Sequence, residues 1–220
     1  MRICFVSGET LLSFRESEMG EKADIFLFGF NGMGEVDYER ELQGETNYFE
    51  RAALLSKNTK SVVVCGCITN TRGHKRKSAV IAENGRLKGV SDMLHVIDEE
   101  VGSGASLRIY ETGQGRMGVS VAEDLHFPEV VKALADCGSD FIVCPYAQVY
   151  NGLPSVLLRA NAYCFGTPIF LCGAGYAMIA NSAGELVFAS PQKRCVAEFE
   201  NKTEYHLVQV RRRGIYNPCG

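Results

Sequence analysis

The stretch that decides the fold runs from Gly118 to Glu129 and reads GVSVAEDLHFPE. Its first four residues include two valines and no charge, which is typical of a buried strand. Pro128 suits the first turn of a helix because its missing amide hydrogen is not needed there, and Glu129 is favoured at the positive end of a helix. The stretch therefore predicts a sharp turn from a strand into a helix.

Three helices are expected along the chain. The first begins at Asn47, where Glu50 would complete a capping box, and continues through Leu55. The second begins near Pro128 and ends at Gly138, and the third runs from about Pro154 to Gly166. Short apolar, β-branched runs predict strands at Arg2–Val6, Ile25–Phe30, Ser61–Ile68, Ser78–Ala82, Arg86–Val90, Leu107–Thr112, Met117–Val121, Phe141–Cys144, Pro168–Cys172, Ala177–Ala180, Glu185–Ala189, Cys195–Phe199 and Tyr205–Val210.

Two short segments predict tight turns between strands. Asn84-Gly85 is typical of a type I′ hairpin, since both residues tolerate a positive φ. Ser182-Ala183-Gly184 predicts a second hairpin turn. Hairpins together with helices favour an α/β fold of sheets with helices on their outer faces.

Length and composition restrict the class of protein. A chain of 220 residues suits one α/β domain spanning residues 1–220. The net charge of −3 gives no general attraction to nucleic acid or to anionic membranes. No apolar run approaches the roughly 20 residues of a membrane span, and the first residues lack the layout of a signal peptide. We therefore expect a cytoplasmic protein with neither nucleic acid nor membrane as a partner.

The cysteines indicate buried thiols. The chain has nine, an odd number, and most lie in apolar runs, as do Cys65, Cys67 and Cys144. This usage is typical of a reducing compartment and not of a disulfide framework. The four histidines are scattered and the spacing of Cys65 and Cys67 fits no zinc motif, so we expect no metal and no cofactor.

The Gly118–Glu129 stretch resembles the nucleophile elbow of the nitrilase superfamily, the carbon–nitrogen hydrolases. That motif is a strand, a cysteine, any residue, Asp-Leu, arginine and Phe-Pro-Glu before a helix, and Asp124-Leu125 and Phe127-Pro128-Glu129 match it. Ala23–Phe28, Ala133–Pro145 and the hairpin at Asn84-Gly85 also resemble family segments, so the resemblance covers nearly all of Arg2–Val210. It implies a four-layer α-β-β-α sandwich that dimerises through its helical faces.

The resemblance also assigns the positions of the chemistry. The family hydrolyses amides or nitriles with a cysteine thiolate as nucleophile, a glutamate as general base and a lysine that stabilises the oxyanion. In this chain the three positions fall on Ala122, Phe30 and Met93. Alanine cannot attack, phenylalanine cannot carry a proton, and methionine has no charge, so we expect a degenerate triad.

Four further residues are candidates for lining the pocket. Ser120 lies two residues before Ala122 and would face the same side of a strand. Asp124 matches a residue that holds the elbow turn in the family, whereas Glu123 and His126 are predicted to be turn and surface residues. Tyr146, after the strand that follows the elbow, completes the four candidates, which are Ser120, Glu123, Asp124 and Tyr146.

Two basic runs favour plain structural interpretations. His74–Lys77 is predicted to be the charged approach to a hairpin, and Arg211–Arg213 a solvated chain end. Cys144 and the other thiols in apolar segments are predicted to be inert, because burial raises the pKa of a thiol.

The expected function is a nitrilase-superfamily protein that lacks carbon–nitrogen hydrolase activity and has a binding or regulatory role. We expect a homodimer formed through the helices that begin near Pro128 and Pro154, and a small-molecule ligand of unknown identity. The alternative is a divergent carbon–nitrogen hydrolase with a relocated active site. A third interpretation is a structural partner that pairs with an active paralogue.

Overall fold

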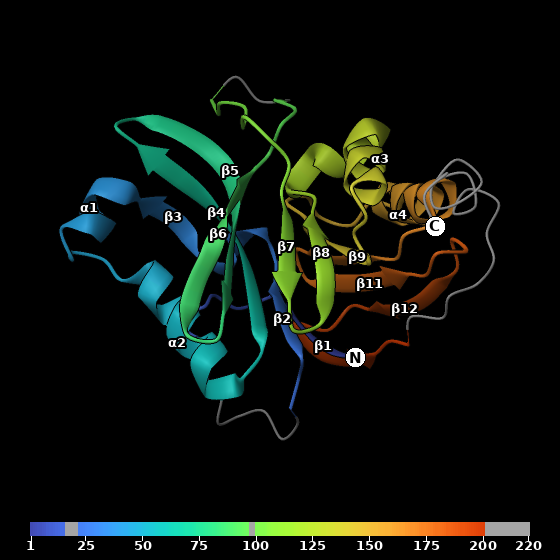
Figure 1. Cartoon of the computed structure of the whole chain (residues 1–220), viewed down its shortest axis with the longest axis horizontal. Coiled ribbons are helices and arrows are strands. Elements are labelled where there is room, and N and C mark those ends of the chain that lie inside the picture. Colours follow the sequence, from blue (N-terminus) through green and yellow to red (C-terminus); the bar gives the residue numbers. More distant parts are fainter. Residues whose placement is uncertain (16–21, 97–99, 201–220) are drawn as a thin grey trace, which may run out of the picture.

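The computed structural model describes residues 1–15, 22–96 and 100–200, which form two β-sheets and their covering helices (Figure 1). The strand predicted at Tyr205–Val210 and the basic run Arg211–Arg213 lie outside the described residues. Within the described ranges, no helix is both long and apolar enough to cross a membrane.

The first sheet has the strand order β13-β1-β2-β4-β5-β6, with β3 paired to β4 beside that path. β1, β2 and β4 run parallel, and the other neighbours on the path are antiparallel. Its strands are β1 (Arg2–Val6), β2 (Ile25–Phe28), β3 (Gly34–Asp37), β4 (Val62–Thr71), β5 (His74–Glu83), β6 (Arg86–Asp92) and β13 (Arg194–Glu198).

The second sheet has the order β12-β11-β10-β9-β8-β7. β8, β9 and β10 run parallel, and hairpins add β7 at one edge and β11 and β12 at the other. Its strands are β7 (Ile109–Thr112), β8 (Gly115–Val119), β9 (Phe141–Pro145), β10 (Ile169–Gly173), β11 (Tyr176–Ala180) and β12 (Leu186–Ser190).

Successive side chains of a strand face opposite sides of the sheet, and this alternation separates the layers of the fold. Ile3 and Phe5 of β1 face an apolar core between the two sheets, while Cys4 and Val6 face a second cluster beneath α2 (Tyr48–Thr59). A third cluster joins the second sheet to α3 (Pro128–Asp136) and α4 (Leu153–Phe165). Figure 1 shows α2 outside one sheet and α3 and α4 outside the other. The predicted α-β-β-α sandwich is confirmed.

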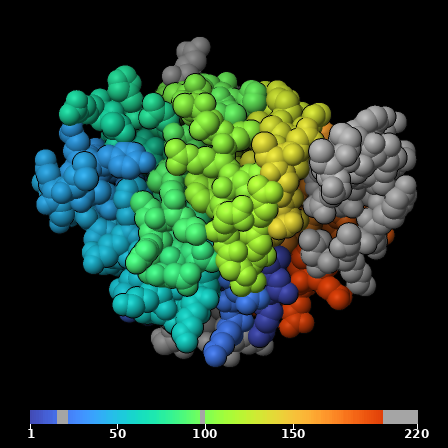
Figure 2. Space-filling view, viewed as in Figure 1, coloured from blue at the N-terminus to red at the C-terminus, as the bar shows by residue number. Residues whose placement is uncertain are grey.

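The seam between the sheets is closed by the β7–β8 hairpin. Figure 2 shows this hairpin packed beside β6 on one face of the molecule. The hydroxyls of Ser91 and Tyr110 lie 2.9 Å apart across the seam, and the buried Glu83 carboxylate accepts the Gly113 amide at 2.7 Å. The two sheets are therefore joined by polar contacts as well as by the core between them.

The predicted turns and helices are present. Asn84 and Gly85 have φ of 53° and 77° between the paired residues Glu83 and Arg86, as a type I′ hairpin requires. All three helices form close to the predicted bounds. Among the described residues, the prediction missed β3, the short helix α1 (Tyr38–Leu42) and a 3-10 helix at Phe30–Gly32, so the strand expected at Ile25–Phe30 ends at Phe28. The first turn of α1 is capped by Asp37 through the amides of Glu39 and Arg40.

The predicted capping box of α2 is wrong. The Asn47 side chain makes no cap hydrogen bond and accepts instead from the Arg51 guanidinium at 3.0 Å. The first amides of the helix, those of Tyr48 and Phe49, donate to the carboxylate of Glu41 at 3.0 and 3.1 Å. The cap therefore comes from α1, six residues before Asn47, which a local motif does not reveal.

We expect Glu41→Ala to lower the free energy of unfolding by about 1 kcal/mol, because the helix loses a charged cap. The matched change Glu50→Ala should alter it by less than about 0.5 kcal/mol. Urea denaturation of both variants measures the difference. A larger loss of unfolding free energy for Glu50→Ala than for Glu41→Ala would mean that Glu50 caps the helix, and would contradict the cap by Glu41.

Candidate functional site

The predicted elbow is a strained turn. β8 ends at Val119, a 3-10 helix spans Ala122–His126, and α3 begins at Pro128. Ala122 has a φ of +50°, in the left-handed region, which costs an alanine about 1 kcal/mol. Ala122 is fully buried, so the surrounding packing holds it in this conformation.

Asp124 fixes the turn to the other sheet. Its buried carboxylate accepts the amide of Leu94 at 2.8 Å and the amide of His95 at 2.9 Å, just after β6. The His95 ring also contacts it at 3.2 Å and stacks on Phe127. Burial raises the pKa of the Asp124 carboxyl, although the hydrogen bonds from His95 and Leu94 oppose that shift. Asp124 has the structural role that the sequence predicted.

The three positions assigned to the chemistry each follow the C-terminal end of a strand. Phe30 comes just after β2, Met93 directly after β6, and Ala122 shortly after β8. All three are buried in the core cluster between the sheets. Gly66 permits the close approach of Phe30, because a Cβ at Gly66 would lie 2.4 Å from the Phe30 Cα.

One side chain that the sequence analysis did not select connects these positions. The Lys77 ammonium lies 2.9 Å from the Glu123 carboxylate, beside Ala122, and 6.0 Å from the centre of the Phe30 ring. The Lys77 carbonyl accepts the Met93 amide at 2.8 Å. Lys77 therefore contacts the residue next to Ala122 through its ammonium and Met93 through its backbone, and its positive charge lies 6.0 Å from the Phe30 ring.

Lys77 and Glu123 form a buried ion pair. Their side chains are 14% and 4% exposed. The prediction that Glu123 is a surface residue is wrong, and the charged run ending at Lys77 is not wholly solvated. The reason is that Glu123 lies on the inward side of the 3-10 turn, where Lys77 neutralises it.

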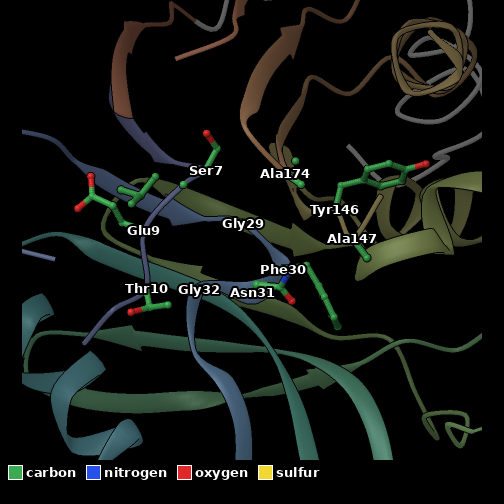
Figure 3. A pocket seen from close by; sticks show the side chains of 13 residues that line it. Ser7, Glu9, Thr10, Gly29, Phe30, Asn31, Gly32, Tyr146, Ala147 and Ala174 are labelled. Atoms are coloured by element: carbon green, nitrogen blue, oxygen red, sulfur yellow. The ribbon is translucent and has the colours of Figure 1, made fainter. Parts of the chain in front are cut away.

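A cavity of about 240 Å³ opens beside the triad positions (Figure 3). Loops after β1, β2, β9 and β10 line it, and Figure 3 shows Phe30, Tyr146 and Ala174 around it. The Tyr146 hydroxyl lies 2.6 Å from Nε2 of His126. Of the four predicted pocket residues, only Tyr146 lines this cavity. Ser120 does not, because β8 already ends at Val119 and strand alternation no longer applies to it. Glu123 and Asp124 do not either, because their carboxylates bind Lys77 and the amides of Leu94 and His95.

Two nucleophilic side chains near the elbow, those of Cys144 and Ser120, are both buried. Cys144 on β9 is fully buried and its thiol donates toward the Ala122 carbonyl at 3.8 Å, from the helix side of the sheet. Burial raises the pKa of the Cys144 thiol far above its usual range. The buried Ser120 hydroxyl has no nitrogen or oxygen partner among the described residues and lies beside the Cys144 thiol. Outside the gaps at 16–21, 97–99 and 201–220, no three metal-ligating side chains gather.

Comparison with known proteins agrees with the geometry. The family model described as carbon-nitrogen hydrolase matches residues 23–213. A probable nitrilase from Schizosaccharomyces pombe is 39% identical over 88 residues, which are 38% of this chain and 32% of that protein. The aligned part thus spans about a third of that curated relative.

Solved structures show the same fold. A mutant amidase of the nitrilase superfamily from Nesterenkonia AN1 superposes with a TM-score of 0.74 at 19% identity, covering 89% of this chain and 88% of that one. Another mutant, which shows Michael addition of acrylamide at the active site cysteine, superposes with a TM-score of 0.76 at 19% identity and 96% coverage of both chains.

We expect Ala122→Gly to leave the free energy of unfolding within about 0.5 kcal/mol of wild type. Relief of the left-handed strain, about 1 kcal/mol, offsets the loss of one buried methyl group. The control Ala52→Gly, inside α2, should cost about 2 kcal/mol because it loses helix propensity and a buried methyl together. Equal losses in urea denaturation would mean that the turn is not strained.

We expect Asp124→Asn to cost about 2 kcal/mol, because an amide has one acceptor oxygen and leaves the amide of Leu94 or His95 without a partner. Asp136→Asn on the exposed face of α3 is the control, and its effect should stay below about 0.5 kcal/mol. Urea denaturation measures both changes. An Asp124→Asn variant as stable as wild type would contradict the structural role of Asp124.

Proposed function

Since the chain belongs to the carbon–nitrogen hydrolase family, we propose that it is a member without hydrolase activity that has a binding or regulatory role. The observation that carries this proposal is the buried environment of Ala122. The residues at the three triad positions are apolar, and the two charged groups beside them, Lys77 and Glu123, neutralise each other. Among the described residues, the charged side chains of Lys77, Glu123 and Asp124 near the elbow are engaged with each other or with backbone amides.

The chemistry requires groups that these positions do not supply. Amide hydrolysis by this family needs a thiolate, a base that moves a proton, and a cation that receives the oxyanion. Ala122 has no nucleophilic atom, and Phe30 and Met93 have neither a proton to transfer nor a charge. Phe30 also lines the cavity, whereas Ala122 and Met93 are not among its lining residues.

The second candidate is a hydrolase with a relocated active site. The presence of a carboxylate and an ammonium beside Ala122 favours it, because these are the kinds of group that the family uses. Against it, the two groups are paired at 2.9 Å and buried, and Cys144 is held protonated behind the elbow. We therefore favour the inactive protein.

Purified wild-type protein should hydrolyse simple amides and nitriles no faster than buffer. Ala122→Cys should also be inactive, since a thiol without a base keeps a pKa near 8.5 and triad members act as a unit. Ammonia release from acetamide, butyramide and acetonitrile measures both. Turnover by wild type that is abolished at one identifiable residue would establish the relocated site.

We also propose a homodimer that pairs through α4, with the cytoplasm as its location. The exposed face of α4 carries Leu153, Val156 and Tyr163 at helical spacing, and Val149 and Tyr150 extend this apolar face before the helix. Apolar faces of this kind mark symmetric interfaces. The cytoplasmic location is supported by the eight described cysteines, which are all free thiols.

Sedimentation should find wild type as a dimer and Val156→Asp as a monomer, because a charge would be buried at the interface. Leu54→Asp is the matched control, since Leu54 is about as exposed but lies on α2 in the opposite layer. A monomeric wild type at micromolar concentration, or dissociation of both variants alike, would contradict the proposed interface.

A further inference from the structure

The Lys77–Glu123 ion pair has no part in a mechanism, yet it joins the residue next to Ala122 to a lysine that lies 6.0 Å from the Phe30 ring. Lys77 lies on β5 of the first sheet, and Glu123 follows Ala122 in the elbow of the second. Among the described contacts of the Lys77 ammonium, Glu123 is its ion-pair partner and the Phe30 ring lies 6.0 Å away. A buried ammonium without an anion is strongly unfavourable, so Lys77 needs this carboxylate.

The pair is also separated from the open cavity. Phe30 lines the cavity, whereas neither Lys77 nor Glu123 does. On the other side, the backbone of Met93 is hydrogen-bonded to that of Lys77, and Met93 is fully buried. The ammonium thus lies near Phe30 and Glu123 with its side chain 14% exposed, and of these two neighbours only Glu123 offers it an anion.

We propose that Glu123 is an intramolecular ligand that occupies Lys77, and that Lys77 is a binding site for a small carboxylate once Glu123 is withdrawn. The inference rests on the proposed function, because it explains how a site without catalytic groups is kept occupied. Its test measures binding, and the turnover assay measures catalysis, so either can fail without the other.

Glu123→Ala provides the test, because it removes one CH2–COO⁻ group and leaves a space that matches acetate. The variant should melt about 10 °C below wild type, since it leaves a buried charge unpaired. Acetate should raise its Tm saturably, by about 3 °C at a concentration about tenfold above its Kd. Acetamide has the same shape without the charge and should have no such effect.

The control is the double variant Lys77→Met with Glu123→Ala, which lacks the ammonium. It should not respond to acetate beyond wild type, and ionic strength is matched with chloride throughout. An equal rise in wild type, Glu123→Ala and the double variant would show a general salt effect and overturn the proposal. A folded Glu123→Ala that does not respond to acetate would overturn it as well.

If Glu123→Ala does not fold in chloride, far-ultraviolet circular dichroism in acetate and in acetamide makes the same comparison. Recovery of the folded spectrum in acetate alone supports the carboxylate site, and failure in both contradicts it. Glu123→Asp keeps the carboxylate on a shorter side chain and should recover more of the lost Tm than Glu123→Asn, which has the same shape without the charge, whereas a purely steric role of Glu123 predicts equal recovery.

Discussion

The turn from Ala122 to Asp124 is the constraint on which the rest of the site depends, because it clamps the two sheets together. The Asp124 carboxylate holds the amides of Leu94 and His95 after β6, and the neighbouring Glu123 carboxylate holds Lys77 on β5. Both contacts cross from the second sheet to the first. The first contact holds the chain directly after Met93, and the second holds the Lys77 ammonium, which lies 6.0 Å from the Phe30 ring.

The turn has kept a geometry that an alanine does not favour. A φ of +50° is strained for any residue with a Cβ, and strain of this kind persists where the surrounding structure over-determines it. In the family such an elbow presents a nucleophile, whereas here it presents a methyl group. The clamp through Asp124 and Glu123 gives the turn a structural reason to persist without the chemistry.

The sequence predicted the fold well because the elbow motif and the hairpin at Asn84-Gly85 are local signals. It did not predict the Lys77–Glu123 pair, since the two residues are 46 positions apart and each belongs to a run that looks solvated. The cap of α2 was missed for the same reason, because it comes from Glu41 in another helix. Ser120 was placed in the pocket by strand alternation, which ends at the turn.

The sequence and the structure thus agree on the family. They differ mainly in the positions of the charged side chains of Lys77 and Glu123. Peptide mapping after incubation with acrylamide tests the central claim most directly, because acrylamide adds to the active site cysteine in a mutant of the Nesterenkonia amidase. We predict labelling at the exposed Cys137 and Cys164, and none at Cys144 or within Ala122–His126. Labelling of Cys144 ahead of the exposed thiols would show an activated nucleophile and contradict the claim that the site is inactive.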